Sequence, residues 1–212
     1  MIYVDRNRIG TPKILESEAF HEAIREQLDN HSKYKNEQQG IEINYSMINE
    51  FRGDTRELFH DKCAYCESRI THEGYDLIQH FRPPTVALDD RGEPRAGYWW
   101  LAYEWSNLYL VCDQCSRYKS NRFPIDGKPL AEGSTDYDSE RYILLDPCHQ
   151  EDMANEHFFY NAEGEVQATS ERAHRTIETL GLNRNDLVER RSVTWDKFNQ
   201  IILKNTSQIE DT

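Results

Sequence analysis

Four cysteines in two short pairs have the residue type and spacing of metal ligands. Cys63 and Cys66 are separated by two residues, and so are Cys112 and Cys115. Each pair can chelate from one tight turn, and four thiolates form the ligand set of a closed, tetrahedral structural zinc site. Iron in a rubredoxin-like site is compatible with the same ligands, but nothing else in the sequence indicates electron transfer. We therefore expect zinc, with no open coordination position for water.

His80 and Asn107 lie in the stretch between the two cysteine pairs. A histidine near its unperturbed pKa is a competent general base at pH 7. A histidine held beside a zinc-stabilised scaffold is therefore the arrangement expected of a small metal-dependent nuclease. The competing interpretation is that a solitary histidine only satisfies a local hydrogen bond.

The elements that must position these residues follow from the hydrophobic pattern. The segments DLIQHF (76–81) and NLYLVC (107–112) are short, apolar and rich in β-branched or aromatic residues, which predicts two strands. The sequence DQCSRYKSN after Cys112 suits a short helix. Two strands and a helix joined to cysteine turns predict a compact ββα-metal unit.

The flanking segments predict further helices. Residues from about 15 to 60 are expected to be helical, because Phe20, Ile24 and Leu28 recur at helical spacing, with a break at Gly40. In the C-terminal third we expect a strand over 141–147, a hairpin turn at 162–164, a helix over 170–181 and a second helix from about residue 185. The apolar stripe of this second helix is predicted to pack in the core, and consists of Val188, Trp195, Phe198 and Ile202.

These patterns predict an α+β fold with three segments. Residues 1–55 form a helical N-terminal extension, residues 56–130 the core with its zinc site, and residues 131–212 a C-terminal α/β extension packed on the core. Cys148 has no paired cysteine and is expected to pack as a small apolar residue.

Composition indicates a protein without membrane spans. No apolar run in the 212 residues reaches the ~20 needed to cross a bilayer. The first ten residues, MIYVDRNRIG, lack the apolar core of a signal peptide, so we expect a cytoplasmic protein with reduced cysteines. The net charge is −13, but residues 56–130 hold 10 Lys/Arg against 11 Asp/Glu. The acidic residues therefore lie mainly in the flanks, which is consistent with a partner supplying the main nucleic-acid surface.

Three segments, DLIQHFRPP, GYWWLAYEWSNLYLVC and CDQCSRYKSNRFP, resemble the HNH (His-Me finger) endonucleases. They are most similar to the HNH nuclease subunit of Septu-type anti-phage defence systems, which also occurs with some retrons. The resemblance runs from Cys63 to Pro124 and extends more weakly into LLDPCHQED, HFFYNAEGEV and RTIETLGLNR…LVERR. It implies a zinc-stapled, treble-clef-like ββα-metal core.

The resemblance also implies roles for individual residues. His80 would be the general base that deprotonates water, and Asn107 would fix the loop that carries this histidine. A divalent ion, Mg²⁺ or Mn²⁺, would stabilise charge on the scissile phosphate. Gln79 and Ser116 stand where relatives carry an acidic residue and a His or Asn that hold this ion. Their oxygens bind Mg²⁺ more weakly, so Asp76 or Asn121 would help, a partner would complete the site, or catalysis has been lost.

Nucleic acid and protein partners are implied as well. Arg82, Lys119 and Arg122 are candidates for phosphate contact, with exposed charges near a turn as the alternative. Resemblance implies an ABC/SMC-like ATPase partner and, in retron versions, a reverse transcriptase with its multicopy DNA. The substrate would be DNA or structured RNA. A non-catalytic zinc-stabilised adaptor and an iron or redox protein are the rival functions.

Overall fold

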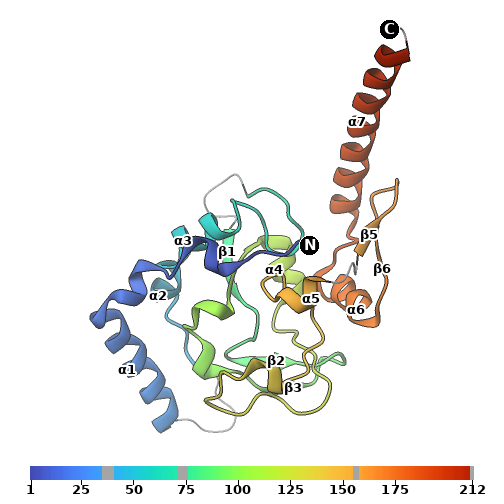
Figure 1. The fold of residues 1–212 in the computed structure, drawn as a ribbon. Coiled ribbons are helices and arrows are strands. Elements are labelled where there is room, and N and C mark those ends of the chain that lie inside the picture. Colours follow the sequence, from blue (N-terminus) through green and yellow to red (C-terminus); the bar gives the residue numbers. More distant parts are fainter. Residues whose placement is uncertain (35–40, 71–75, 155–157, 211–212) are drawn as a thin grey trace.

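The computed structural model describes residues 1–34, 41–70, 76–154 and 158–210. These parts of the chain combine helices with small two-stranded antiparallel sheets, which confirms the predicted α+β class. Figure 1 shows a rounded body from which one long C-terminal helix projects. Within the described ranges, none of the helices is long and apolar enough to pass through a membrane.

Among the described residues, three α-helices precede the first strand, within the range of about 15 to 60 that was expected to be helical. They follow two 3-10 turns, Arg6–Ile9 and Lys13–Glu16, and are α1 (Glu18–Tyr34), α2 (Tyr45–Asn49) and α3 (Arg52–Leu58). Phe20 packs edge-on against Phe51 at 5.6 Å between ring centroids, and Phe51 stacks on Trp105 at 5.7 Å. The N-terminal helices therefore pack on the segment that leads into the second predicted strand. Gly40, the expected helix break, lies outside the described residues.

The two central strands form as predicted and pair with each other. Strand β1 (Asp76–His80) is antiparallel to β4 (Leu108–Cys112), with His80 opposite Leu108 at one end and Asp76 opposite Cys112 at the other. Helix α4 (Asp113–Lys119) follows β4 directly. Between the strands lie β2 (Val86–Leu88), β3 (Pro94–Ala96) and 3-10 turns at Trp99–Leu101 and Trp105–Asn107.

The C-terminal third also follows the pattern in most places. It contains a 3-10 turn (Tyr137–Ser139), α5 (Gln150–Ala154), the hairpin of β5 (Phe158–Tyr160) and β6 (Val166–Ala168), α6 (Glu171–Leu180) and α7 (Asn185–Glu210). Helix α6 has the predicted caps. The Ser170 side chain accepts from the backbone N–H of Ala173, and Gly181 adopts a left-handed conformation with φ +57°.

The predicted strand over 141–147 was wrong. Its only ladder contact among the described residues is an isolated bridge between Tyr142 and Ile125. The backbone N–H of Ile143 donates to the Pro124 carbonyl, and that of Leu145 donates to Oγ1 of Thr176. These two backbone N–H groups are thus bonded to a loop carbonyl and to a side-chain hydroxyl, so they need no neighbouring strand.

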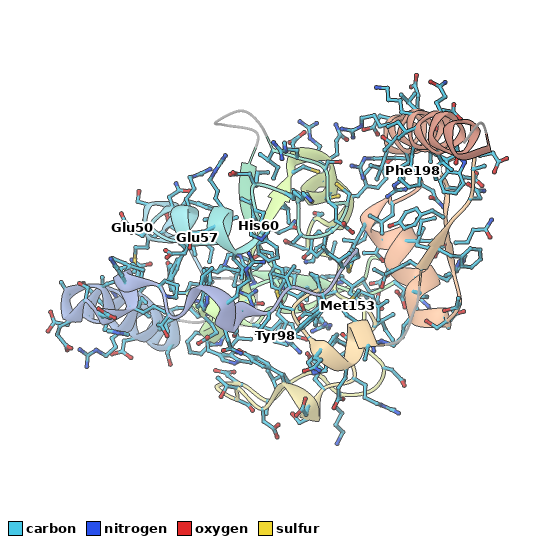
Figure 2. All side chains as sticks on the ribbon, turned by 45° about the horizontal axis from the view of Figure 1, so that its top comes forward. Glu50, Glu57, His60, Tyr98, Met153 and Phe198 are labelled. Carbon is cyan, nitrogen blue, oxygen red and sulfur yellow. The ribbon has the colours of Figure 1, made fainter. Side chains whose placement is uncertain are left out.

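The predicted core packing of the α7 stripe was also wrong. Trp195, Phe198 and Ile202 are 42%, 57% and 47% exposed. Figures 1 and 2 show why, since α7 extends away from the body and the labelled Phe198 lies on this projecting part. Leu187, in the first turn, is 3% exposed and belongs to the core. The periodicity of this stripe correctly predicts a helix, but the protein body covers only the beginning of the helix.

One main core joins the three predicted segments. Its buried members come from the N-terminus, the central hairpin and the C-terminal helices, for example Met1, Tyr109, Leu180 and Leu187. The C-terminal helices share this core with the central strands, and the division of the chain into three segments stays a prediction. This core places α6 and the start of α7 next to the cysteine turns.

Candidate functional site: a tetracysteine centre beside a histidine pocket

The four cysteines of the two pairs meet at one point. The Sγ atoms of Cys63, Cys66, Cys112 and Cys115 all lie within 4.8 Å of one another. The first two come from the turn after α3, Cys112 ends β4, and Cys115 lies in the first turn of α4. Sulfurs around a tetrahedral zinc with bonds of about 2.3 Å would be separated by about 3.8 Å, and the Cys66–Cys112 separation is 3.7 Å.

The chemistry of this donor set fits zinc. Hydrogen bonding from Cys112 lowers the pKa of the Cys66 thiol, whereas burial raises the pKa of the Cys63 thiol. Four adjacent sulfurs cannot all carry a negative charge in a buried site without a cation. The cluster is therefore a candidate metal centre with four protein ligands, as the sequence predicts, and it leaves no position for a reacting water.

His80 ends β1 as a half-buried side chain with a defined tautomer. Its Nε2 lies 2.8 Å from the carbonyl oxygen of Ala102. Because a carbonyl can only accept, Nε2 carries the proton and the neutral ring keeps its lone pair on Nδ1. Loss of hydration, assisted by the nearby Lys119 and opposed by the Ala102 hydrogen bond, lowers the pKa of His80 to about 4. The imidazole is therefore neutral at pH 7.

Asn107 binds both backbone polar groups of Arg82, the second residue after His80. Its Oδ1 accepts from the backbone N–H of Arg82 at 2.7 Å, and its Nδ2 donates to the Arg82 carbonyl at 3.0 Å. Nδ2 also donates to the carbonyl of Leu101 at 3.1 Å. The side chain is 3% exposed, so these bonds are shielded from water. The amide uses both its donor and its acceptor to hold the backbone after His80.

Gln79 and Ser116 lie with His80 in one small cavity of about 350 Å³. The Gln79 Nε2 donates to the Ser116 carbonyl at 3.2 Å and to Ser116 Oγ at 3.3 Å. Its Oε1 is buried and has no hydrogen-bond partner among the described residues. Asn121 also lines the cavity, whereas Asp76 begins β1, at the end that pairs with Cys112. The cavity therefore combines a neutral imidazole with amide and hydroxyl oxygens.

The three predicted phosphate contacts differ in exposure. Arg82 is buried, and its Nε donates to Oε2 of Glu140 at 2.8 Å. Lys119 is fully buried, and its Nζ donates to the His80 carbonyl at 3.0 Å. Arg122 is exposed. Arg82 and Lys119 are therefore internal contacts of the backbone at and after His80. Of the three residues, only Arg122 has the exposure that contact with a phosphate requires.

Glu140 was missed in the sequence and forms the centre of a buried polar cluster. It is 3% exposed, and it accepts from Arg82, from the hydroxyl of Tyr98 and from the backbone N–H of Leu130. The sequence around Glu140 does not indicate its role, because its partners are 10 to 58 residues away in the chain. Glu140 ties the loop after His80 to the 130–140 segment.

We expect Glu140→Gln to lower the free energy of unfolding by about 3 kcal/mol, because it leaves the buried Arg82 guanidinium without its counter-charge. Urea denaturation monitored by circular dichroism measures the change. The exposed Asp138, two residues away, supplies the control Asp138→Asn, which should lie within about 0.5 kcal/mol of the wild type. Equal stability of both variants would contradict the assigned role of the ion pair.

The lowered pKa of His80 gives a pH prediction. The folded chain should resist protonation of His80 until about pH 4, while the unfolded chain takes up a proton near pH 6.5. Between these values the unfolded state binds more protons, so the contribution of His80 to stability falls as the pH falls from 6.5 to 4. Between pH 7 and pH 5, the free energy of unfolding should fall less in His80→Asn than in the wild type, as measured by denaturation at both pH values. NMR titration of the imidazole would reveal a pKa near 6.5 if this is incorrect.

Fold and site together define an α+β protein with a four-cysteine candidate metal centre and a separate histidine pocket. The chain is similar to two proteins of Bacillus mycoides (strain KBAB4). It is 35% identical to the Septu protein PtuB over 143 residues, which are 65% of this chain and 48% of PtuB. It is 36% identical to the Septu protein PtuA over 151 residues, which are 69% of this chain and 21% of PtuA. No family model matches the chain.

These similarities confirm the expected relationship to Septu proteins. The chain spans about half the length of PtuB and about a fifth of PtuA. The activity, substrates and partners of this chain are therefore matters of proposal, built on the site.

Proposed function

We propose that this chain is a metal-dependent HNH-type endonuclease subunit of an anti-phage defence complex. The observation that carries the proposal is the position of His80. Its imidazole is neutral, its proton is fixed on Nε2, and it shares a cavity with Gln79 and Ser116. This cavity lies on an antiparallel strand pair followed by a short helix that carries Cys115. The similarity to Septu proteins supports the defence role.

In the proposed reaction, Nδ1 of His80 takes a proton from a water molecule that attacks the scissile phosphorus. The bond from phosphorus to one sugar oxygen breaks, and that leaving oxygen takes up a proton from solvent. Lys119 and Asn107 keep the histidine in place by holding its own carbonyl and the backbone of Arg82, two residues further on. Mg²⁺ or Mn²⁺, when bound, would offset negative charge on the phosphate in the transition state. The unpaired Oε1 of Gln79 and the hydroxyl of Ser116 are the groups that would hold such an ion.

The proposed substrate is a nucleic acid, DNA or structured RNA, recognised through its phosphate backbone. Arg122 is the exposed cation nearest in sequence to the cavity residue Asn121. Because the chain carries a net charge of −13, it binds nucleic acid poorly by itself. We infer that a partner supplies the binding surface, an ABC/SMC-like ATPase or, in a retron context, a reverse transcriptase with its multicopy DNA.

A second candidate function is a non-catalytic adaptor that binds nucleic acid or protein. It is favoured by the absence of a carboxylate from the described lining of the cavity, where Gln79 and Ser116 supply neutral oxygens. Neutral oxygens hold Mg²⁺ less tightly than carboxylates. In the adaptor, His80 would have no chemical role and its replacement would leave function intact.

The first test is cleavage of plasmid DNA and total cellular RNA by the chain co-purified with its genomic neighbours. Reactions with Mg²⁺, with Mn²⁺ and without divalent ion should differ, with cutting only where an ion is present. The degraded pool identifies the substrate. An intact zinc-loaded complex that cuts neither pool under any of these conditions would contradict the nuclease and favour the adaptor.

A further inference from the structure

Arg184 lies directly against the cysteine cluster, although it comes from the far C-terminal part of the chain. Its Nη1 is 3.5 Å from Sγ of Cys115, and its Nη2 is 3.6 Å from Sγ of Cys66 and 4.0 Å from Sγ of Cys112. The residue is 7% exposed. One guanidinium thus faces three of the four candidate zinc ligands from a position shielded from water.

The local structure holds this guanidinium in place. Nη1 also donates to the carbonyl of Gly181 at 3.1 Å, and Nε is paired with Oδ1 of Asp186 at 3.1 Å. Gly181 itself has φ +57°, and a side chain there would meet the ring of Tyr118 on α4 at 2.3 Å. The corner between α6 and α7 can therefore approach α4 closely only because residue 181 has no side chain.

The charges at this position are complementary. Four thiolates around Zn²⁺ carry a formal charge of −2, and burial makes such a charge unfavourable. A guanidinium is always charged and presents several N–H donors in one plane, so it can donate to more than one sulfur while neutralising part of this charge. A lysine offers one compact charge and lacks this fork.

We propose that Arg184 is an outer-sphere residue of the zinc centre, which stabilises the zinc-bound thiolates and thereby couples metal binding to the docking of the α6–α7 corner. When zinc is bound, the sulfurs are charged and the guanidinium is held. When zinc is removed, the four sulfurs are no longer held around one cation, and Arg184 loses the fixed sulfur partners while keeping only the exposed carboxylate of Asp186. The contact through which Arg184 connects the α6–α7 corner to Cys115 on α4 is then lost.

The affinity of the chain for zinc tests this proposal in competition with a chromophoric chelator. Arg184→Met keeps much of the side-chain volume but removes the donors, and it should weaken zinc binding about tenfold or more. Arg184→Lys should fall between Arg184→Met and the wild type. The matched control is Lys197→Met on α7, because Lys197 is exposed and, in the described part of the chain, is not paired with Asp186 or with a cysteine sulfur.

Cobalt(II) in place of zinc gives a readout that a merely structural role would not change. N–H donors withdraw electron density from thiolate, so Arg184→Met should move the sulfur-to-cobalt charge-transfer band to longer wavelength. Lys197→Met should leave the band unchanged. If Arg184→Met does not fold, Arg184→Lys supplies the same comparison of bands and affinities.

Hydrogen exchange in the wild-type chain tests the coupling. Removal of zinc should speed amide exchange at residues 181–195 together with the cysteine turns. Unchanged zinc affinity and cobalt spectra in both Arg184 variants would overturn the outer-sphere role. Exchange that rises only at the cysteine turns would overturn the coupling to the α6–α7 corner. Neither result depends on whether the chain cuts nucleic acid.

Discussion

Replacement of His80 with alanine should reduce cleavage by a factor of about 10² to 10⁴, the usual contribution of a general base. The reason is that His80 is a cavity-lining imidazole with a lowered pKa, and its free lone pair is fixed on Nδ1 by the Ala102 hydrogen bond. The side chain is half-buried, and its one hydrogen bond within the described part of the chain is to Ala102, so the variant should fold and keep its zinc. Cleavage rates of the purified complex, measured beside its zinc content and circular dichroism, check this result.

The matched control for His80→Ala is His174→Ala. His174 is exposed on α6 and pairs with Glu178, away from the cavity that His80 lines. It should cut at the wild-type rate. Equal cutting by the wild type and His80→Ala would show that a contaminant or a neighbouring subunit carries the activity, and the assignment of His80 would fail.

Removal of one zinc ligand should have the largest effect on stability. Cys115→Ala leaves three sulfurs, and Cys115 is fully buried in the first turn of α4. Binding of zinc to four thiolates supplies an apparent free energy of about 10 to 16 kcal/mol, comparable with the whole stability of a typical domain at about 5 to 15 kcal/mol. We expect the variant to be largely unfolded at 25 °C, as judged by circular dichroism and zinc content.

Cys148→Ser is the control for the ligand variant. Cys148 packs at the edge of the core, outside the four-cysteine cluster, so this change should keep the full zinc content and cost about 1 kcal/mol. A Cys115→Ala chain with wild-type melting behaviour and no zinc would mean that the metal is not part of the fold.

The features that were predictable from the sequence are those that depend on neighbouring residues. The spacing of the cysteines anticipates their convergence, because each pair needs only one tight turn. The apolar runs predict β1 and β4, and Ser170 and Gly181 mark the ends of α6 through local capping geometry. That Asn107 lies against the backbone after His80 was expected only from the resemblance to HNH nucleases.

The features that were missed depend on contacts between distant parts of the chain. Arg82 carries a charge and was expected at the surface, but Glu140, 58 residues away, allows it to be buried. Arg184 reaches Cys66 across 118 residues. The apolar stripe of α7 has core periodicity, yet its burial depends on whether another surface covers it, and periodicity carries no information on that.

Two groups of possible metal ligands lie at opposite ends of the β1–β4 pair. Cys112 lies at one end of the pair and His80 at the other, about 13 Å apart along five paired residues at ordinary strand spacing. Soft thiolates select zinc, whereas amide and hydroxyl oxygens suit hard ions such as Mg²⁺. Four thiolates therefore disfavour Mg²⁺, and a magnesium ion proposed for the His80 end would use none of the groups that zinc would use. The two metals would then bind without competing for the same side chains.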